Sequence, residues 1–260
     1  MGTYEFDGEK YKKASKHQKE WGYSLISQIH LTGHEKILDL GCGDGALTER
    51  LADLVPEGNV LGIDASTGMI QTAKALERAN LKFVRMDINV MAFKDEFDII
   101  YSNAALHWVK DHVSLLKNSL QALKPGGSIY WNFAGNGTCA AFNRLMREII
   151  AEPEYEPYFI NFQWPWVMLS AKEYKRMAQE AGFCQIQITE ENKDRYFANE
   201  NELIQWIDQP SIVPFIQDVP SEKKEAFRRE AVEKMVARTR QADGTCFETF
   251  RRINICAKKP

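Results

Sequence analysis

The stretch Ile37-Leu38-Asp39-Leu40-Gly41-Cys42-Gly43-Asp44-Gly45-Ala46-Leu47-Thr48 decides the fold of this chain. It begins as an apolar run typical of a buried strand, and it then places glycine at alternate positions. Leu47, Leu51 and Leu54 follow at the spacing of a helix. A strand, a glycine-rich turn and a helix in this order are typical of a nucleotide-cofactor site, because glycine lets the backbone turn sharply and approach a ligand.

Acidic residues around this turn indicate which cofactor it binds. Dinucleotide-binding folds use Gly-x-Gly-x-x-Gly and face a pyrophosphate, whereas this chain has Gly-x-Gly-x-Gly preceded by Asp39, which would repel a pyrophosphate. Asp64 ends the next apolar stretch, where a carboxylate can accept hydrogen bonds from both hydroxyls of a ribose. Both acids fit a nucleoside with a cationic amino-acid tail. We therefore expect S-adenosylmethionine as the cofactor, with S-adenosylhomocysteine as product, and disfavour a nicotinamide dehydrogenase.

Further motifs follow this turn in order, at residues 61–64 (LGID), 83–88 (FVRMDI), 97–103 (FDIIYSN) and 123–128 (LKPGGS). Together with the glycine turn, they resemble the class I methyltransferase family over about residues 35–133. The LHWV tetrapeptide at 106–109 is similar to the branch that holds trans-aconitate, biotin-pathway malonyl-carrier and juvenile hormone acid methyltransferases, which methylate carboxylates. The resemblance implies an α/β, Rossmann-like sheet of seven mostly parallel strands with an antiparallel last strand, plus a small helical cap.

Hydrophobic patterning predicts where the elements lie. Strands are expected at 36–41, 59–64, 81–86, 97–102, 128–133, 183–189 and 245–258. Helices are expected at 45–55, 67–78, 113–123, 171–181 and 221–242, with Ser66 or Thr67 opening the second and Gly182 closing the fourth. The expected regions are an N-terminal flap and docking helix (1–34), a cofactor-binding core (35–133), a lid insertion (134–170), the rest of the core (171–189 and 246–260) and a helical cap (190–245).

The resemblance also implies which residues hold the cofactor. In the family, an acid at the position of Asp87 accepts a hydrogen bond from the adenine amine, with the backbone of Ile88 nearby, and an apolar residue such as Met69 packs on adenine. A helix cap for Asp87 and ordinary core packing for Met69 are the alternatives. Ser102 and Asn103 are expected to act through backbone groups. The expected cofactor-binding residues are Asp39, Gly41, Cys42, Gly43, Asp64, Ala65, Met69, Asp87, Ile88, Ser102 and Asn103.

His107 is the candidate catalytic residue, because it follows a strand end next to the expected methyl group; a packed structural histidine is the alternative. The aromatic-rich residues 134–170 predict a lid or substrate wall, and a patch that covers the sheet or makes a dimer is the alternative. The N-terminal segment, with His17, is expected as a flap over the cofactor or as a solvated tail. Candidate substrate-contacting residues are Tyr11, Gln18, Trp21, His107, Trp108, Arg144 and Trp164.

Composition narrows the class of protein. The 260 residues carry a formal net charge of −3, so there is no global basic field for nucleic acid. The five cysteines are scattered and odd in number, which favours a reducing cytoplasm, and no zinc-ligand spacing occurs, so no metal is expected. No apolar run is long enough to cross a bilayer. We expect a cytoplasmic enzyme, monomeric or homodimeric, with a small-molecule substrate.

Three functional hypotheses follow from these residues. The first is O-methylation of a small-molecule carboxylate, which is ionised at pH 7 and needs no general base. The second is methylation of a lipid, quinone or polyketide oxygen or carbon, with His107 as the base. The third is a non-catalytic scaffold or sensor that binds S-adenosylmethionine.

Overall fold

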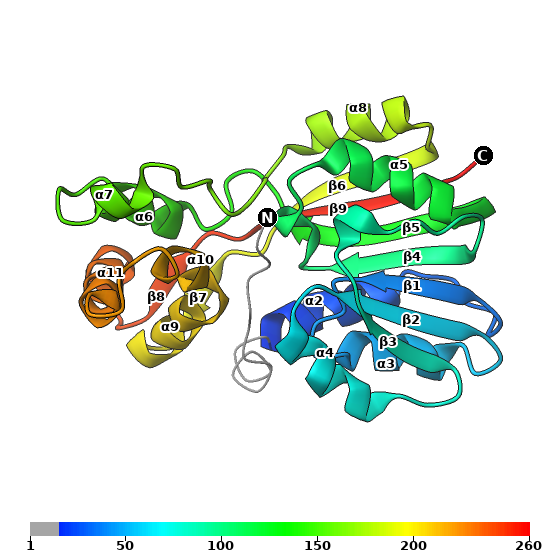
Figure 1. Cartoon of the computed structure of the whole chain (residues 1–260), viewed down its shortest axis with the longest axis horizontal. Coiled ribbons are helices and arrows are strands. Elements are labelled where there is room, and N and C mark those ends of the chain that lie inside the picture. Colours follow the sequence, from blue (N-terminus) through cyan, green and yellow to red (C-terminus); the bar gives the residue numbers. More distant parts are fainter. Residues whose placement is uncertain (1–15) are drawn as a thin grey trace. The chain divides into compact units, whose positions relative to one another are not determined.

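A computed structural model describes residues 16–260 of the chain (Figure 1). Two compact units are present within these residues. The first is formed by residues 16–136, 166–191 and 252–260, and the second by residues 137–165 and 192–251. Among the described residues, no helix is both long enough and apolar enough to cross a membrane.

The first unit is built on a seven-stranded sheet with the strand order β3-β2-β1-β4-β5-β9-β6. Its first five strands pair in parallel, and β9 runs antiparallel to β5. This topology confirms the expected mostly parallel sheet with an antiparallel last strand. The strands are β1 (Lys36–Leu40), β2 (Asn59–Asp64), β3 (Leu81–Arg85), β4 (Phe97–Asn103), β5 (Leu123–Ala134), β6 (Cys184–Asn192) and β9 (Arg251–Lys258).

Helices cover both faces of this sheet, because alternate residues of its central strands are apolar and buried. Ile37 of β1 packs in a cluster with residues of α2 (Lys16–Ile26), α3 (Ala46–Leu54) and α4 (Thr67–Ala73). Leu38 packs instead with residues of α5 (His112–Ala122) and α8 (Ala171–Ala181), two helices that run together in Figure 1. The two clusters lie on opposite faces of the sheet, and the site lies at the carboxyl ends of its parallel strands, where open α/β sheets bind ligands.

Helix ends in the first unit follow the expected signals. Ser66 caps α4 by accepting from the backbone of Met69, and α8 begins with a capping box between Ser170 and Glu173. Gly182 ends α8 in the left-handed conformation, with φ of +104°.

The second unit joins residues 137–165 and 192–251 around one aromatic core. Its helices are α6 (Ala140–Ile150), α7 (Glu156–Phe159), α9 (Glu200–Trp206), α10 (Val213–Ile216) and α11 (Lys224–Thr239), with the turn η4 (Ile207–Ser211). Phe142 of α6 meets the rings of Trp206 and Phe215 at 5.5 and 6.2 Å. A short sheet pairs β7 (Arg195–Phe197) with β8 (Cys246–Glu248), and the buried Glu248 accepts from the backbone of Phe142 at 2.9 Å, which caps α6.

Several sequence-based boundaries were wrong. The strand expected at 128–133 begins at Leu123. The single strand expected at 245–258 is split into β8 and β9, because the backbone of Phe250 bonds sideways: its N–H donates to Asp194 and its carbonyl accepts from Lys193. The helix expected at 67–78 ends at Ala73 and continues only as the 3-10 turn η1 (Lys74–Leu76). The helix expected at 221–242 is α11, which is shorter at both ends.

Candidate functional site

The glycine turn after β1 forms the floor of the candidate site. Gly41, Gly43 and Gly45 all have positive φ, at +72°, +55° and +83°. The backbone N–H of Gly41 donates to the carbonyl of Ile63 at 2.8 Å, which ties the turn to β2. A Cβ on Gly41 would lie 2.3 Å from the Cβ of Ala105, whereas a Cβ on Gly43 would meet nothing within 4 Å. Gly41 is therefore required for packing, and Gly43 faces open space.

Asp39 is a buried carboxylate beneath this turn, only 2% exposed. Its Oδ2 accepts a hydrogen bond from Thr48 Oγ1 at 2.7 Å, at the start of α3. Burial raises the pKa of Asp39 to about 7; the Thr48 bond opposes this rise, and the negative charge of Asp64 adds to it. A bound cation next to this carboxyl group would stabilise its ionised form and so lower its pKa.

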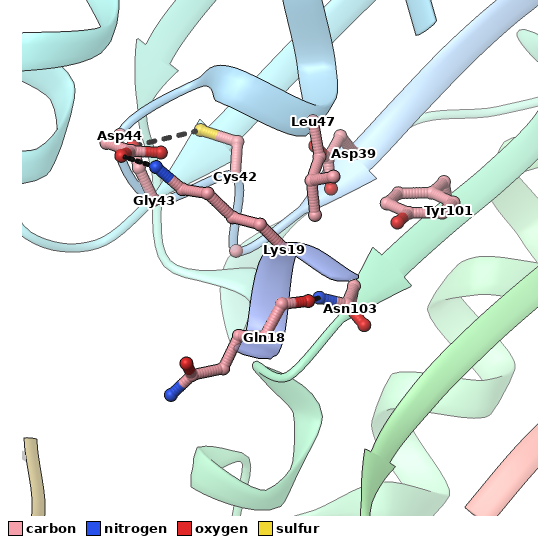
Figure 2. Close-up of a pocket in the computed structure, with 10 residues that line it drawn as sticks. Gln18, Lys19, Asp39, Cys42, Gly43, Asp44, Leu47, Tyr101 and Asn103 are labelled. Carbon is pink, nitrogen blue, oxygen red and sulfur yellow. Dashed lines mark hydrogen bonds and ion pairs between the residues drawn. The ribbon is translucent and has the colours of Figure 1, made fainter. Parts of the chain in front are cut away.

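A pocket opens above the turn, and Figure 2 shows the side chains around it. The helix α2 contributes to its wall: Lys19 Nζ lies 2.7 Å from Asp44 Oδ2, and Asn103 Nδ2 donates to the carbonyl of Gln18 at 2.9 Å. Tyr101 also binds α2, since its hydroxyl donates to the carbonyl of Gly22. The pocket is lined by Gln18, Lys19, Asp39, Gly41, Cys42, Gly43, Asp44, Leu47, Tyr101 and Asn103.

The lining of this pocket fits a cationic guest. The side-chain oxygens Gln18 Oε1 and Asn103 Oδ1 are buried and accept no hydrogen bond within the described residues. Asp39 adds a third acceptor beneath the turn, and Figure 2 shows that the side-chain amide of Gln18 points away from Asp39, so these oxygens are separate acceptors of the lining. Cys42 lines the pocket with an uncharged thiol. Burial and the charges of Asp64 and Asp39 raise the pKa of this thiol well above its ordinary value, so it stays protonated. The residues present therefore fit the methionine end of S-adenosylmethionine.

Most of the expected cofactor-binding residues lie around the same edge of the sheet, and the structure divides them into two groups. Asp39, Gly41, Cys42, Gly43 and Asn103 line the pocket together. A second group, outside this lining, comprises Asp64, Ala65, Met69, Asp87, Ile88 and Ser102.

In this second group the polar side chains already bond the backbone. Asp64 accepts from the N–H groups of Gly43 at 3.0 Å and Ser66 at 2.9 Å, and so braces the turn. Asp87 accepts from the backbone of Asn89 at 2.9 Å and caps the turn η2 (Ile88–Val90). The hydroxyl of Ser102 donates its proton to the carbonyl of Leu40, so its side chain has no donor left for a ligand.

Met69, Ile88 and Ala65 are apolar parts of the same edge. Met69 is 3% exposed and Ile88 is 9% exposed, so both belong to the packed interior. The carbonyl of Ala65 accepts from Arg85 Nε at 3.1 Å. Contact of Met69 and Ile88 with adenine, and of Ala65 with the cofactor, stays a prediction.

His107 and Trp108 form the turn η3 (Leu106–Trp108) after β4. His107 Nδ1 is buried with no hydrogen-bond partner among the described residues, and the carbonyl of His107 accepts from the backbone of Val167 at 2.8 Å. Burial, followed by the positive charge of Arg252, lowers the pKa of His107 to about 3. The ring is therefore neutral at pH 7. Trp108 packs edge-on against Trp166, with ring centroids 5.6 Å apart.

The other candidate substrate residues are dispersed. The ring of Trp21 lies under the guanidinium of Arg252, with 4.5 Å between the guanidinium carbon and the ring centroid. In the second unit, Arg144 is exposed on α6, and Trp164 stacks with Arg147 at 4.0 Å. Tyr11 lies outside the described residues, and so does the side chain of His17.

Sequence reasoning missed four residues of the pocket wall: Lys19, Asp44, Leu47 and Tyr101. Asp44 and Leu47 stand inside the glycine motif, so the motif itself was a signal for them. Lys19 and Tyr101 had none, because each becomes part of the wall only through the docking of α2 on the sheet.

Comparison with known proteins identifies the class. Residues 38–131 match a family described as a methyltransferase domain. The trans-aconitate 2-methyltransferase of Mycobacterium tuberculosis (strain ATCC 25177 / H37Ra) is 30% identical over 262 residues, which cover 97% of this chain and 96% of that protein. A second trans-aconitate 2-methyltransferase, from Rhodococcus jostii, is 28% identical, with 97% and 99% covered.

Solved structures agree on the fold. Phosphoethanolamine N-methyltransferase 2 of Haemonchus contortus, in complex with S-adenosyl-L-methionine, aligns with a TM-score of 0.60 and 19% identity over 97% of this chain and 56% of that one. An S-adenosylmethionine-dependent methyltransferase of Mesorhizobium loti aligns with a TM-score of 0.52 and 21% identity over 92% and 97%.

The fold and the acidic pocket thus define an S-adenosylmethionine-dependent methyltransferase. Within that class, the chain belongs to the methyltransferase family that includes the trans-aconitate 2-methyltransferases. The expected class of enzyme and its cofactor are confirmed.

Proposed function

We propose that this enzyme methylates a carboxylate oxygen of a small polycarboxylic acid. The observation that carries the proposal is the similarity to trans-aconitate 2-methyltransferases along nearly the whole chain, including the segments outside the cofactor-binding core. The pKa of His107, lowered to about 3, supports it independently, because a ring that holds a proton so weakly is a poor general base for an acceptor that has to lose one.

Cofactor binding follows from the acids and amide oxygens of the first unit. When bound, S-adenosylmethionine supplies a methyl group activated by the positive charge of its sulfonium. We assign its ammonium group to the carboxylate of Asp39, beneath the glycine turn of the pocket. Asp64 is assigned to the ribose hydroxyls, and Asp87 to the adenine amine, with Met69 and Ile88 against the ring.

Transfer then requires only alignment and the exclusion of water. An acceptor carboxylate ionises near pH 4 and is already nucleophilic at pH 7. One of its oxygens attacks the methyl carbon while the bond to sulfur breaks, and no proton has to move. Holding the reactants in line supplies on the order of 7 to 11 kcal/mol of the barrier reduction. His107 acts in this scheme as a neutral wall and not as a general base.

Other assignments of this enzyme stay predictions from the sequence. They are the lid role of residues 134–170, the substrate-selecting role of residues 190–245, a cytoplasmic location and a monomeric or homodimeric state. The same holds for the expectation that nucleic acid is not a partner.

A panel of acceptors tests the proposal. The purified protein is incubated with S-adenosylmethionine and, separately, with tricarboxylic acids such as trans-aconitate, dicarboxylic acids, isoprenoid acids, acyl-carrier thioesters and phenols, and the products are weighed by mass spectrometry. We expect a gain of one methyl group on a polycarboxylic acid, with an equal amount of S-adenosylhomocysteine. The Asp64→Ala variant serves as the control for cofactor-dependent transfer. Methylation of phenols or carbon acceptors alone would overturn the proposal.

A further inference from the structure

Arg147 lies over an aromatic ring in the second unit. Its guanidinium carbon is 4.0 Å from the centroid of the Trp164 ring, and Arg147 itself is exposed on α6. At this distance the cation is in direct contact with the face of the ring, and tryptophan is the aromatic side chain that binds a cation most strongly. The contact therefore restrains a side chain that would otherwise be mobile in solvent.

The ring of Trp164 is itself held by the aromatic core of the second unit. Phe215, which is fully buried, meets it edge-on with ring centroids 5.2 Å apart, and Phe162 meets it edge-on at 6.3 Å. Trp164 is only half-buried, so part of its surface is left for Arg147. The core thus fixes the ring, and the ring in turn positions the guanidinium before any ligand arrives.

The N–H donors of Arg147 are open to a ligand. Within residues 16–260, Arg147 has no hydrogen bond and no ion pair, and its contact with Trp164 uses no donor. Other arginines of the second unit each pair with a carboxylate, namely Arg195, Arg228, Arg238, Arg240 and Arg251. Arg147 therefore combines a positioned guanidinium with unused donors.

Arg144 provides a natural comparison, because it is exposed on the same helix three residues earlier. Among the described contacts, it has neither an ion pair nor an aromatic ring beneath it. Its charge acts on Glu148, whose pKa is lowered first by a hydrogen bond from Arg238 and then by the charges of Arg238 and Arg144. Arg144 is therefore an unrestrained surface charge, whereas Arg147 is restrained.

We propose that Arg147 and Trp164 form a carboxylate-binding site of the second unit, and that its ligand is a small aliphatic polycarboxylic acid. A guanidinium binds both oxygens of a carboxylate through two parallel N–H groups, and the aromatic ring leaves those groups free. The choice of a polycarboxylic acid rests on the proposed function. The carboxylate belongs either to the acceptor itself or to a second molecule of the same acid, and kinetics distinguish the two sources.

Calorimetry tests binding directly. The full-length enzyme is saturated with S-adenosylhomocysteine, which prevents turnover, and is titrated with trans-aconitate at constant ionic strength. We expect Arg147→Gln to weaken the affinity at least about tenfold, the scale of losing charge-assisted hydrogen bonds. Arg147→Lys should recover only part of this loss, because lysine lacks the planar fork. Trp164→Phe should weaken the affinity by a smaller factor, because phenylalanine binds a cation less strongly than tryptophan does.

Arg144→Gln is the matched control. It removes the same charge from the same helix, but we expect the affinity for trans-aconitate to stay within about twofold, because salt screens an exposed charge that makes no hydrogen bond to the ligand. Sulfate serves as the control anion and should bind far more weakly than trans-aconitate. An equal loss in Arg144→Gln and Arg147→Gln, or equal affinity for sulfate, would overturn the proposed site.

Steady-state kinetics with trans-aconitate as the acceptor identify the source of the carboxylate. If the acceptor occupies the site, KM in Arg147→Gln should rise by the same factor as the calorimetric dissociation constant, with a smaller change in kcat. If a second molecule occupies it, KM should stay within about twofold while the titration loses one of its binding steps. Both outcomes support a carboxylate site at Arg147 and differ only in which molecule fills it.

An NMR titration separates ligand binding from a structural role. The Nε–H signal of Arg147 is identified by its loss in Arg147→Gln, and it should shift when trans-aconitate is added to the wild-type enzyme. The melting temperature of Arg147→Gln without ligand should equal that of the wild-type protein, because the residue is exposed. A signal that trans-aconitate does not move would overturn the site.

These outcomes are distinct from those of the proposed function. If the wild-type enzyme methylates polycarboxylic acids but Arg147→Gln keeps both its affinity and its KM, the site at Arg147 is overturned and the function stands. If the wild-type enzyme binds trans-aconitate through Arg147 but methylates no carboxylic acid, the function falls and the site stands. If it neither binds nor methylates any polycarboxylic acid, both proposals fall.

Discussion

Replacing Asp39 by asparagine tests the electrostatic design of the cofactor pocket. Burial raises the pKa of Asp39 from an ordinary value of 3.8 to about 7, so the folded chain holds this proton at pH values where the unfolded chain has lost it. The stability contributed by the protonated form is therefore complete below pH 3.8 and is lost as the pH rises toward 7. The asparagine of the Asp39→Asn variant cannot titrate, and its amide oxygen can still accept from Thr48.

The magnitude follows from the two pKa values. Between pH 5 and pH 8, the wild-type protein without cofactor should lose roughly 2 to 3 kcal/mol of unfolding free energy relative to Asp39→Asn, at about 1.36 kcal/mol for each pH unit between the two pKa values. For a chain of this size, that corresponds to a change of roughly 5 to 10 °C in the gap between the two melting temperatures. Comparing the wild-type protein with Asp39→Asn at each pH cancels the contributions of the other ionisable groups to the stability.

Thermal denaturation followed by circular dichroism at pH 5 and pH 8 measures this gap. Calorimetry near pH 6 supplies a second readout: binding of the cationic cofactor should release a proton from wild-type Asp39, but none from the variant, so only the wild-type heat depends on the buffer. A gap that is the same at both pH values, together with no proton release, would refute the reasoning.

Three further predictions concern the same unit. His107→Gln should keep kcat within about tenfold and leave the pH dependence of kcat between pH 6 and pH 8 unchanged. The reason is that a ring with a pKa of about 3 supplies none of the roughly 100-fold or greater rate gain of a general base. A larger loss of kcat, together with an ionisation that disappears from the pH profile, would contradict this. Gly41→Ala should disrupt the turn, whereas Gly43→Ala should lower the unfolding free energy by only about 1 to 2 kcal/mol, because of left-handed strain. Gly43→Ala should also weaken the cofactor affinity measured by calorimetry. A larger loss of stability in Gly43→Ala than in Gly41→Ala would count against the assigned geometry. Lys19→Met removes the 2.7 Å pair with Asp44 and should speed cofactor release in stopped-flow fluorescence, and an unchanged rate would show that α2 does not restrain the cofactor.

The cofactor-binding core was predictable from sequence because its signals are local. Glycine is favoured where φ is positive, as at Gly41 and Gly43, and a buried parallel strand has a continuous apolar sequence. The caps at Ser66 and Gly182 are likewise determined within a few residues of the chain. These local requirements explain why the cofactor and the mostly parallel sheet could be predicted from motifs.

Other parts of the site depend on contacts between distant segments, which periodicity does not encode. Lys19 reaches the pocket only because α2 docks on β4 and β5, through bonds such as that from Tyr101 to Gly22. Arg252 looked like one more residue of an alternating strand, and the sequence did not indicate its contacts with Asn132 of β5 and Trp21 of α2. The break between β8 and β9 likewise depends on hydrogen bonds to residues about 56 positions earlier in the chain.

The most direct test of the account is the chemical nature of the methylated product. S-adenosylmethionine with an isotope-labelled methyl group is reacted with trans-aconitate and enzyme, and the isolated product is treated with mild alkali. Transfer to a carboxylate oxygen predicts a methyl ester, so the label should be released as methanol and the free acid recovered. A label that stays on the product through this treatment would place the methyl group on carbon or on an ether oxygen, and would contradict carboxylate methylation.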